Sequence, residues 1–205
     1  NTPGDVRKFS YSNNLLAVAD GSIGATVIDF SDSSSPKLIA THSTGSPVSS
    51  VALGGGILFT GLEDGTILSM DARNGFIIDQ ISFAESGKHR QIEDLNFFDG
   101  VLYAVVDMPS WSRWWSYRSA VKVIPVNSGL FHDQAGNLIQ GSSSTDSYGS
   151  RPRRNGRRLF VGENYAYLSH NRGFNYFNLT ANANIKVTRN GTQSAGWRRI
   201  VGNGS

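Results

Sequence analysis

The chain has 205 residues, with 23 Gly, 27 Ser, no Cys and a formal net charge of +3. This length fits one domain with a substantial core. The composition, with 39% hydrophobic and 17% charged residues, is too apolar and too weakly charged for a disordered chain. The lack of Cys excludes a disulfide framework, a thiolate nucleophile and a Cys-ligated zinc site, and no apolar run approaches the roughly 20 residues of a membrane helix.

A sequence pattern recurs about every 42 residues. The segment from Val6 to Asp20 aligns with the segment from Val48 to Leu62, and the next copy begins at Ile92. A fourth copy begins at Arg157, and residues 198–203 repeat its opening. A constant offset of this kind is typical of proteins built from repeated structural units.

Each copy has the pattern of short β-strands. Phe9 and Tyr11 alternate with small or polar residues, which is the period of a half-buried strand. Asp64-Gly65 and Asn74-Gly75 are pairs that favour tight hairpins. No segment has the apolar spacing of a helix, so we predict four antiparallel strands in each copy.

A repeat of this length with four strands is typical of a β-propeller blade. A β-sandwich with turns at similar intervals is the alternative, but it does not explain the constant offset. We therefore predict an all-β propeller of four-stranded antiparallel blades, and we expect the chain to be part of a larger propeller. The predicted blades cover residues 6–41, 48–83, 92–140 and 157–190, and residues 196–205 begin the next blade.

Two segments resemble known repeats. Residues 17–39, which include Ala-Val-Ala-Asp-Gly and Val-Ile-Asp-Phe, resemble the LVIVD repeat of bacterial and archaeal surface propellers. Residues 59–75, with Glu-Asp-Gly-Thr and Met-Asp-Ala-Arg-Asn-Gly, are similar to the blade motif of quinoprotein-like propellers. The resemblance implies a propeller fold but little about function, because propellers include enzymes, receptors and scaffolds.

The third copy is about 22 residues longer than the others, and two insertions, 108–119 and 127–155, account for the difference. The first insertion concentrates residue types that dominate binding surfaces and can also stack on sugar rings. We predict that it binds a protein or a glycan; the alternative is that its Trp side chains fold back and plug the propeller rim. The candidate binding residues are Trp111, Arg113, Trp114, Trp115, Tyr117 and Arg118.

A basic segment begins near the end of the second insertion. Residues 151–205 carry a net charge of +9, which leaves −6 for residues 1–150. We predict that this patch binds an acidic or anionic partner, with nucleic acid the weaker choice because no nucleic-acid-binding motif is present. The alternative is a solvated loop that pairs with acidic surfaces of the earlier blades. The patch consists of Arg151, Arg153, Arg154, Arg157 and Arg158.

The sequence offers no set of catalytic, cofactor-binding or metal-ligating residues. Its four His residues are scattered, and it has neither a nucleophile elbow nor a phosphate-binding loop. Asp20, Asp64 and Asp99 lack the spacing of a calcium loop and are predicted to form turns.

We therefore predict a non-catalytic β-propeller in an extracytoplasmic location (periplasm, cell surface or secreted) that presents loops for protein or glycan binding. One alternative is an enzyme, or a subunit of an enzyme complex, whose site in the propeller channel is assembled from residues far apart in the sequence. Another is a structural component of a surface layer or large complex.

Overall fold

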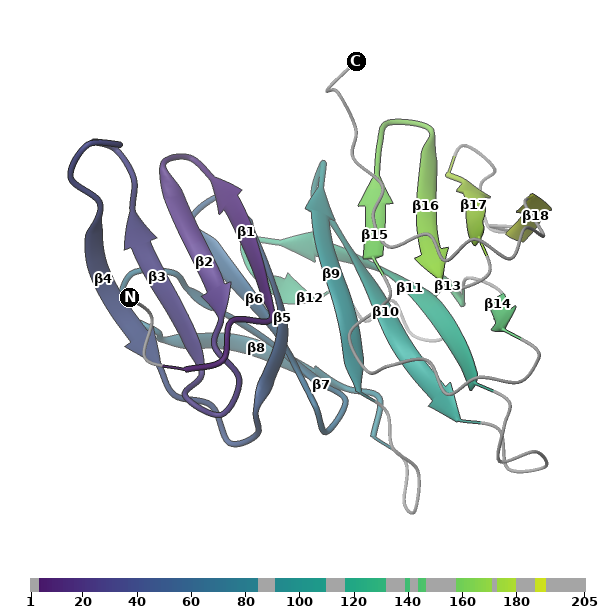
Figure 1. Ribbon diagram of the computed structural model, residues 1–205, viewed down its shortest axis with the longest axis horizontal. Coiled ribbons are helices and arrows are strands. Elements are labelled where there is room, and N and C mark those ends of the chain that lie inside the picture. Colours follow the sequence, from purple (N-terminus) through teal and green to yellow (C-terminus); the bar gives the residue numbers. More distant parts are fainter. Residues whose placement is uncertain are drawn as a thin grey trace.

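The computed structural model describes residues 4–84, 91–109, 117–131, 139–140, 144–146, 158–170, 173–179 and 187–190. Every regular element of this part is a β-strand, and no helix occurs within these ranges. The strands form four antiparallel sheets, each made from strands that follow one another along the chain (Figure 1). The predicted all-β class and the antiparallel sheets are confirmed, and three of the four sheets have the predicted four strands.

The sheets are numbered in chain order. Sheet 1 contains β1 (Lys8–Ser12), β2 (Leu15–Ala19), β3 (Ala25–Asp29) and β4 (Lys37–His42). Sheet 2 contains β5 (Val48–Gly54), β6 (Ile57–Leu62), β7 (Thr66–Asp71) and β8 (Ile77–Ser82). Sheet 3 contains β9 (Ile92–Phe98), β10 (Val101–Pro109), β11 (Tyr117–Asn127), β12 (Leu130–Phe131), β13 (Ile139–Gln140) and β14 (Ser144–Asp146). Sheet 4 contains β15 (Arg158–Val161), β16 (Tyr165–His170), β17 (Gly173–Asn178) and β18 (Val187–Asn190).

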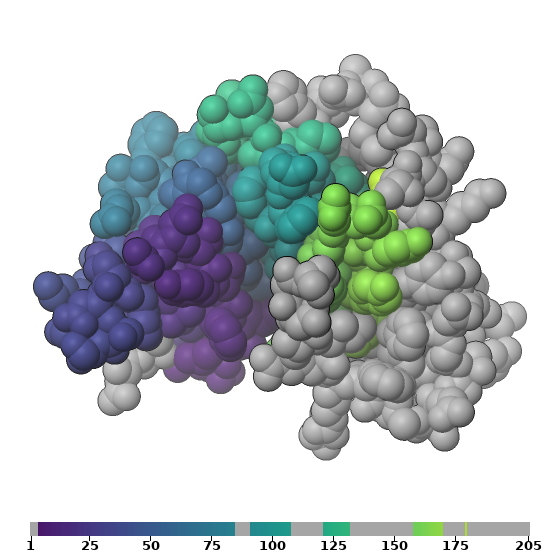
Figure 2. Space-filling model, turned by 90° about the horizontal axis from the view of Figure 1, so that it is seen from above, coloured from purple at the N-terminus to yellow at the C-terminus, as the bar shows by residue number. Residues whose placement is uncertain are grey.

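The first strand of each sheet is the innermost strand. β5 contacts both β1 and β9, and β9 contacts β15. Figure 1 shows β4 and β18 at opposite ends of the molecule, with β1, β9 and β15 between them. In Figure 2 the described sheets follow one another in colour order from purple to green. Every residue of β5 is buried, whereas β4 and β8 are largely half-buried or exposed, so the sheets radiate from a common centre.

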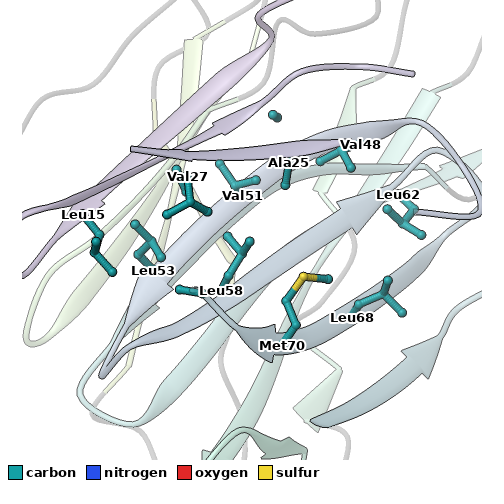
Figure 3. Packing of buried hydrophobic residues seen from close by; sticks show 13 residues of the cluster. Leu15, Ala25, Val27, Val48, Val51, Leu53, Leu58, Leu62, Leu68 and Met70 are labelled. Atoms are coloured by element: carbon teal, nitrogen blue, oxygen red, sulfur yellow. The ribbon is translucent and has the colours of Figure 1, made fainter. Parts of the chain in front are cut away.

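Apolar side chains fill the spaces between successive sheets. Figure 3 shows Leu15 and Val27 of sheet 1 packed against Leu53 and Leu58 of sheet 2. Because strand residues alternate between faces, every second residue of β2 and β3 points into this layer. Two further buried clusters lie between sheets 2 and 3 and between sheets 3 and 4. Burying one such side chain contributes roughly 1.5–3 kcal/mol, and these layers hold the stack together.

Short turns join the strands. Asn13 and Asn14 connect β1 to β2 with φ values of 49° and 62°, the positive values that a tight hairpin of this twist requires. Asp64 accepts a hydrogen bond from the Thr66 amide, and Asp99 has a φ of 47°, which confirms both as turn residues. Asp20 also lies at a turn, but its side chain is fully buried and accepts a hydrogen bond from the Thr26 hydroxyl.

Sheet 3 departs from the other sheets. β10 has nine residues and β11 has eleven, whereas the strands of sheets 1 and 2 have five to seven, so part of the first predicted insertion simply lengthens this hairpin. Three short segments of the second insertion, β12, β13 and β14, pair with β11 in place of one fourth strand. The predicted strand at 196–205 lies outside the described residues.

The turn after β7 gives a prediction about acid stability. The Asp71 carboxylate accepts hydrogen bonds from the amides of Asn74 and Arg73, which hold its pKa below the usual 3.8. A carboxyl whose pKa is lower when folded stabilises the protein above its unfolded pKa, and that contribution is lost as the pH falls through the folded pKa. We therefore expect Asp71→Asn, measured by thermal melting at about pH 6 and about pH 3, to lose less stability on acidification than the unaltered protein. An equal loss in both proteins would contradict this assignment.

Candidate functional site

One strand position recurs on the innermost strand of every sheet. The residue at this position pairs with a residue 11 positions later on the second strand. Three of these side chains are buried and the fourth is half-buried. They carry two cations, one hydroxyl and one carboxylate, and we call them the axial ring. The axial ring consists of Lys8, Ser50, Asp94 and Arg158.

Two β-bulges help to form this ring. In β5 the pairing with β6 skips Ser49, and in β9 the pairing with β10 skips Glu93. Ser49 and Glu93 are 44 positions apart, which is about the length of the repeat. The bulge is therefore a feature of the repeat. A bulge reorients the residues that follow it. As a result Ile92 and Leu95 pack toward sheet 2, while Asp94 turns toward sheet 4.

A buried ion pair joins three sheets at the axial ring. The Lys8 ammonium lies 2.9 Å from Oδ1 of Asp94 and also donates to the Glu93 carbonyl oxygen. Oδ2 of Asp94 accepts a hydrogen bond of 2.7 Å from the Leu159 amide. Side chains from sheets 1 and 3 and backbone from sheet 4 therefore meet at one carboxylate.

Burial affects the pKa of Lys8. Removal of water lowers the pKa of the Lys8 ammonium, the charge of Asp94 opposes that effect, and the positive charge of Arg158 adds to it. A buried ammonium of this kind depends on its carboxylate partner, because an unpaired charge in the interior is strongly disfavoured.

Hydrogen bonds near the axis also link the other neighbouring sheets. Oγ of Ser10 in sheet 1 accepts a bond of 3.0 Å from the Leu53 amide of sheet 2. The Ser49 hydroxyl, at the bulge of β5, lies 2.9 Å from the Gly61 carbonyl oxygen and 2.5 Å from that of Ile92 in sheet 3. The polar groups at the centre thus tie the sheets to one another.

The second candidate site is the extended hairpin of sheet 3. β14, from the second insertion, pairs with β11 at the base of the first insertion, where Tyr117 lies opposite Asp146 and Arg118 opposite Thr145. On its other side β11 pairs with β10, placing Tyr117 opposite Pro109. We call the strand segments 107–109, 117–119 and 144–146 the hairpin platform. It brings together two insertions that are separate in the sequence.

Two of the six predicted binding residues lie on this platform. Tyr117 and Arg118 are part of its β11 strand. Trp111, Arg113, Trp114 and Trp115 lie outside the described residues, between the two strands of the hairpin.

The predicted basic patch is placed only at its last residue. Arg158 begins β15, where its side chain is half-buried and belongs to the axial ring, and its carbonyl oxygen accepts a bond from the Ser169 hydroxyl. Arg151, Arg153, Arg154 and Arg157 lie outside the described residues.

The described ranges contain no candidate metal site. Within them, no group of three or more His, Asp or Glu side chains could hold a metal ion. His42 of β4 instead contacts the Ala72 carbonyl oxygen at 3.1 Å, a contact that joins sheets 1 and 2. No helix that could cross a bilayer is present in the described residues.

Comparison with protein families identifies one repeat. Residues 3–44 match the LVIVD repeat. This range contains β1, β2, β3 and β4, so the matched repeat corresponds to one complete sheet. Comparison with curated protein sequences gave no match.

Solved structures with a similar fold include a designed protein and two enzymes. The computationally designed Ika4 protein has a TM-score of 0.55 and 15% identity over 87% of this chain and 93% of its own. The quinohemoprotein alcohol dehydrogenase ADHIIG from Pseudomonas putida HK5 has a TM-score of 0.60 and 11% identity over 96% of this chain. A europium-containing methanol dehydrogenase has a TM-score of 0.50 and 13% identity over 71% of this chain.

These similarities confirm the predicted β-propeller and its likeness to quinoprotein-type repeats. At such low identity they show the fold alone. The chain covers only 36% of the alcohol dehydrogenase and 26% of the methanol dehydrogenase.

Proposed function

We propose that this chain is a non-catalytic, extracytoplasmic β-propeller that binds an anionic glycan or an acidic protein through the insertions of sheet 3. The observation that carries the proposal is the pairing of β14 with β11, which joins the second insertion to the base of the first. A rigid strand platform positions binding residues more precisely than a free loop does.

The composition of the two insertions supports an anionic partner. Three Trp and two Arg follow β10 within eleven residues, and Arg151, Arg153 and Arg154 lie at the end of the second insertion. Aromatic faces can stack on sugar rings or apolar surfaces, and Arg binds carboxylate and sulfate groups through its planar fork of donors. Aromatic and Arg residues, which can make these two types of contact, are therefore close to the hairpin platform in the sequence.

A structural role for the axial ring supports the non-catalytic part of the proposal. The Lys8 ammonium and both Asp94 oxygens make contacts that join sheets. The side chains of Lys8 and Asp94 thus contribute to the stability of the propeller. The support for an extracytoplasmic location is the LVIVD match over residues 3–44.

The test replaces two aromatic side chains of the first insertion. We expect Trp114→Ala combined with Trp115→Ala to weaken binding to an acidic polysaccharide such as polygalacturonate at least tenfold, because aromatic hot-spot residues contribute about 2 kcal/mol or more each. Binding is measured by biolayer interferometry, with the polysaccharide immobilised, and the melting temperature of each protein is recorded in parallel.

Trp197→Ala provides the matched control, since Trp197 lies outside both insertions. It should leave the affinity unchanged. Unaltered binding in the Trp114/Trp115 variant would contradict the proposal. A fall of several degrees in its melting temperature would instead favour a role for these side chains as a plug of the propeller rim.

A further inference from the structure

The second insertion of sheet 3 begins with a tight turn that rests on sheet 2. β12 pairs with the end of β11 and contacts β8, the outermost strand of the neighbouring sheet. Ser128 and Gly129 form the turn between β11 and β12, with φ values of 51° and 87°. We call residues 127–131 the anchor turn. Its contacts with sheet 2 fix the point at which the second insertion begins.

A carboxylate of sheet 2 holds the anchor turn. Oδ2 of Asp79, in β8, accepts a hydrogen bond of 2.8 Å from the Phe131 amide. The ring of Phe131 also lies 6.2 Å from that of Phe59, in the apolar layer between sheets 2 and 3. One polar and one apolar contact therefore fix Phe131 to sheet 2.

Gly129 packs closely against the same sheet. A β-carbon at this position would lie 2.8 Å from Cδ1 of Ile78 and 3.0 Å from Oγ of Ser69. These separations are well below the 3.5–4.0 Å at which carbon atoms pack favourably. The buried Gly129 thus allows both the positive φ of the turn and the close approach to sheet 2.

Sheet 2 differs from sheet 1 at the positions that face the anchor turn. In both sheets the pairing of the third and fourth strands skips one residue of the fourth strand, which is a β-bulge. The residue after the bulge is Ala40 in sheet 1 and Asp79 in sheet 2, and their partners are Val27 and Ser69. Sheet 2 therefore has a carboxylate and a small hydroxyl where sheet 1 has two apolar side chains.

Beyond the anchor turn, short strand pairs hold the second insertion to sheet 3. β13 pairs with β11 through two residues, and β14 pairs with β11 through three. Pairs of this length contain few hydrogen bonds and are marginal by themselves. A fixed starting point leaves less chain freedom to be lost when these pairs form, so it favours the pairing.

From these contacts we propose that Asp79 and Gly129 are positioning residues for the binding site of sheet 3: they hold the anchor turn on sheet 2 and thereby keep β14 paired at the hairpin platform. This inference rests on the proposed function, because it concerns the same two insertions. Loss of the anchor weakens ligand binding by loosening the platform, and no ligand-binding group is removed.

The first test needs no ligand. Hydrogen–deuterium exchange of the amides of residues 139–140 and 144–146 is measured by mass spectrometry. Asp79→Ala should speed this exchange roughly fivefold, the effect of losing one buried hydrogen bond. Asp79→Asn keeps an acceptor oxygen for the Phe131 amide and should exchange at nearly the unaltered rate.

Asp32→Ala is the matched control for exchange, because Asp32 accepts a hydrogen bond from the Ser34 amide in a turn of sheet 1. It should leave the exchange of residues 139–146 unchanged. Unchanged exchange in Asp79→Ala would overturn the inference. Equal acceleration in sheet 1 would also overturn it, because the substitution would then loosen the whole protein and not the second insertion.

The second test measures binding to immobilised polygalacturonate by biolayer interferometry. Asp79→Ala and Gly129→Ala should each weaken binding roughly fivefold, whereas Asp79→Asn should restore most of the affinity. Gly56→Ala is the control for Gly129→Ala. Gly56 has a φ of 80° in the turn between β5 and β6, but a β-carbon there would meet no atom within 4 Å. Both variants carry the strain of a positive φ, and only Gly129→Ala pushes the anchor turn away from sheet 2.

The outcomes separate this inference from the proposed function. If the unaltered protein binds the polysaccharide and all four variants bind equally well, the inference is wrong and the proposed function stands. No binding by the unaltered protein would overturn the proposed function and with it the role of the anchor in binding. The exchange test decides separately whether Asp79 holds β13 and β14 in place.

Discussion

Asp94→Ala should destabilise the protein by about 3–5 kcal/mol, the largest effect that we expect from one polar substitution. The change leaves the Lys8 ammonium buried without its carboxylate partner. It also removes the acceptor of the Leu159 amide. Breaking one half of a buried ion pair costs more than the pair itself contributes, because the remaining charge stays out of water.

Urea unfolding measures this loss as a lower transition midpoint. Asp32→Ala is the control, since the exposed Asp32 carboxylate accepts hydrogen bonds from the amide and the hydroxyl of Ser34 in its own turn and joins no two sheets. Its substitution should cost about 1 kcal/mol or less. A loss at Asp94 no greater than that at Asp32 would show that the ion pair does not hold the sheets together.

Phe59→Ala should cost about 3–5 kcal/mol, the usual range for a fully buried aromatic side chain. Phe59 is completely buried in the layer between sheets 2 and 3. Its ring stacks on Phe97 with the centres 5.0 Å apart, and the ring of Phe131 lies 6.2 Å away. Truncation removes these contacts and leaves a cavity that the rigid strands around it cannot close.

Phe59→Leu separates the cavity from the loss of the ring, because it keeps most of the apolar volume and should cost clearly less than Phe59→Ala. Phe76→Ala, at an exposed position, should change the unfolding free energy by about 0.5 kcal/mol or less. If Phe59→Ala resembled Phe76→Ala, sheets 2 and 3 would not pack as described.

The sequence predicted the fold because the repeat leaves local signals. Alternation at Phe9 and Tyr11 marked a strand, and glycine-containing pairs such as Asn74-Gly75 marked hairpins, since both patterns depend on neighbours in the chain. Such patterns recur in every copy. The stacking of the sheets follows from the repeat, because each sheet has two faces that neighbouring sheets must cover.

The axial ring could not be predicted in the same way. Lys8 and Asp94 are 86 positions apart and look like ordinary charged residues of separate strands. Their contact depends on the bulge at Glu93, which turns Asp94 away from sheet 2. The only signal was positional, since Lys8, Ser50 and Asp94 occupy the same place in the aligned copies.

The hairpin platform was missed for a related reason. The two insertions of sheet 3 were identified from the lengthened repeat, but their pairing requires β14 to lie beside Tyr117–Ser119. Strand pairing across a connection of more than 20 residues depends on the three-dimensional course of the chain. Composition alone therefore identified the aromatic and basic residues of the insertions. It could not identify the paired strands that hold the two insertions together.

A double-mutant cycle between Lys8 and Asp94 tests most directly whether strands from separate repeats meet at a common centre. The free energies of unfolding of Lys8→Met, Asp94→Leu and the double variant are compared with that of the unaltered protein. We expect the double variant to be more stable than the sum of the single losses predicts, with a coupling of roughly 1.5–3 kcal/mol for residues in direct contact. Strictly additive losses would mean that the two side chains do not meet, and the radial arrangement of the sheets would be wrong.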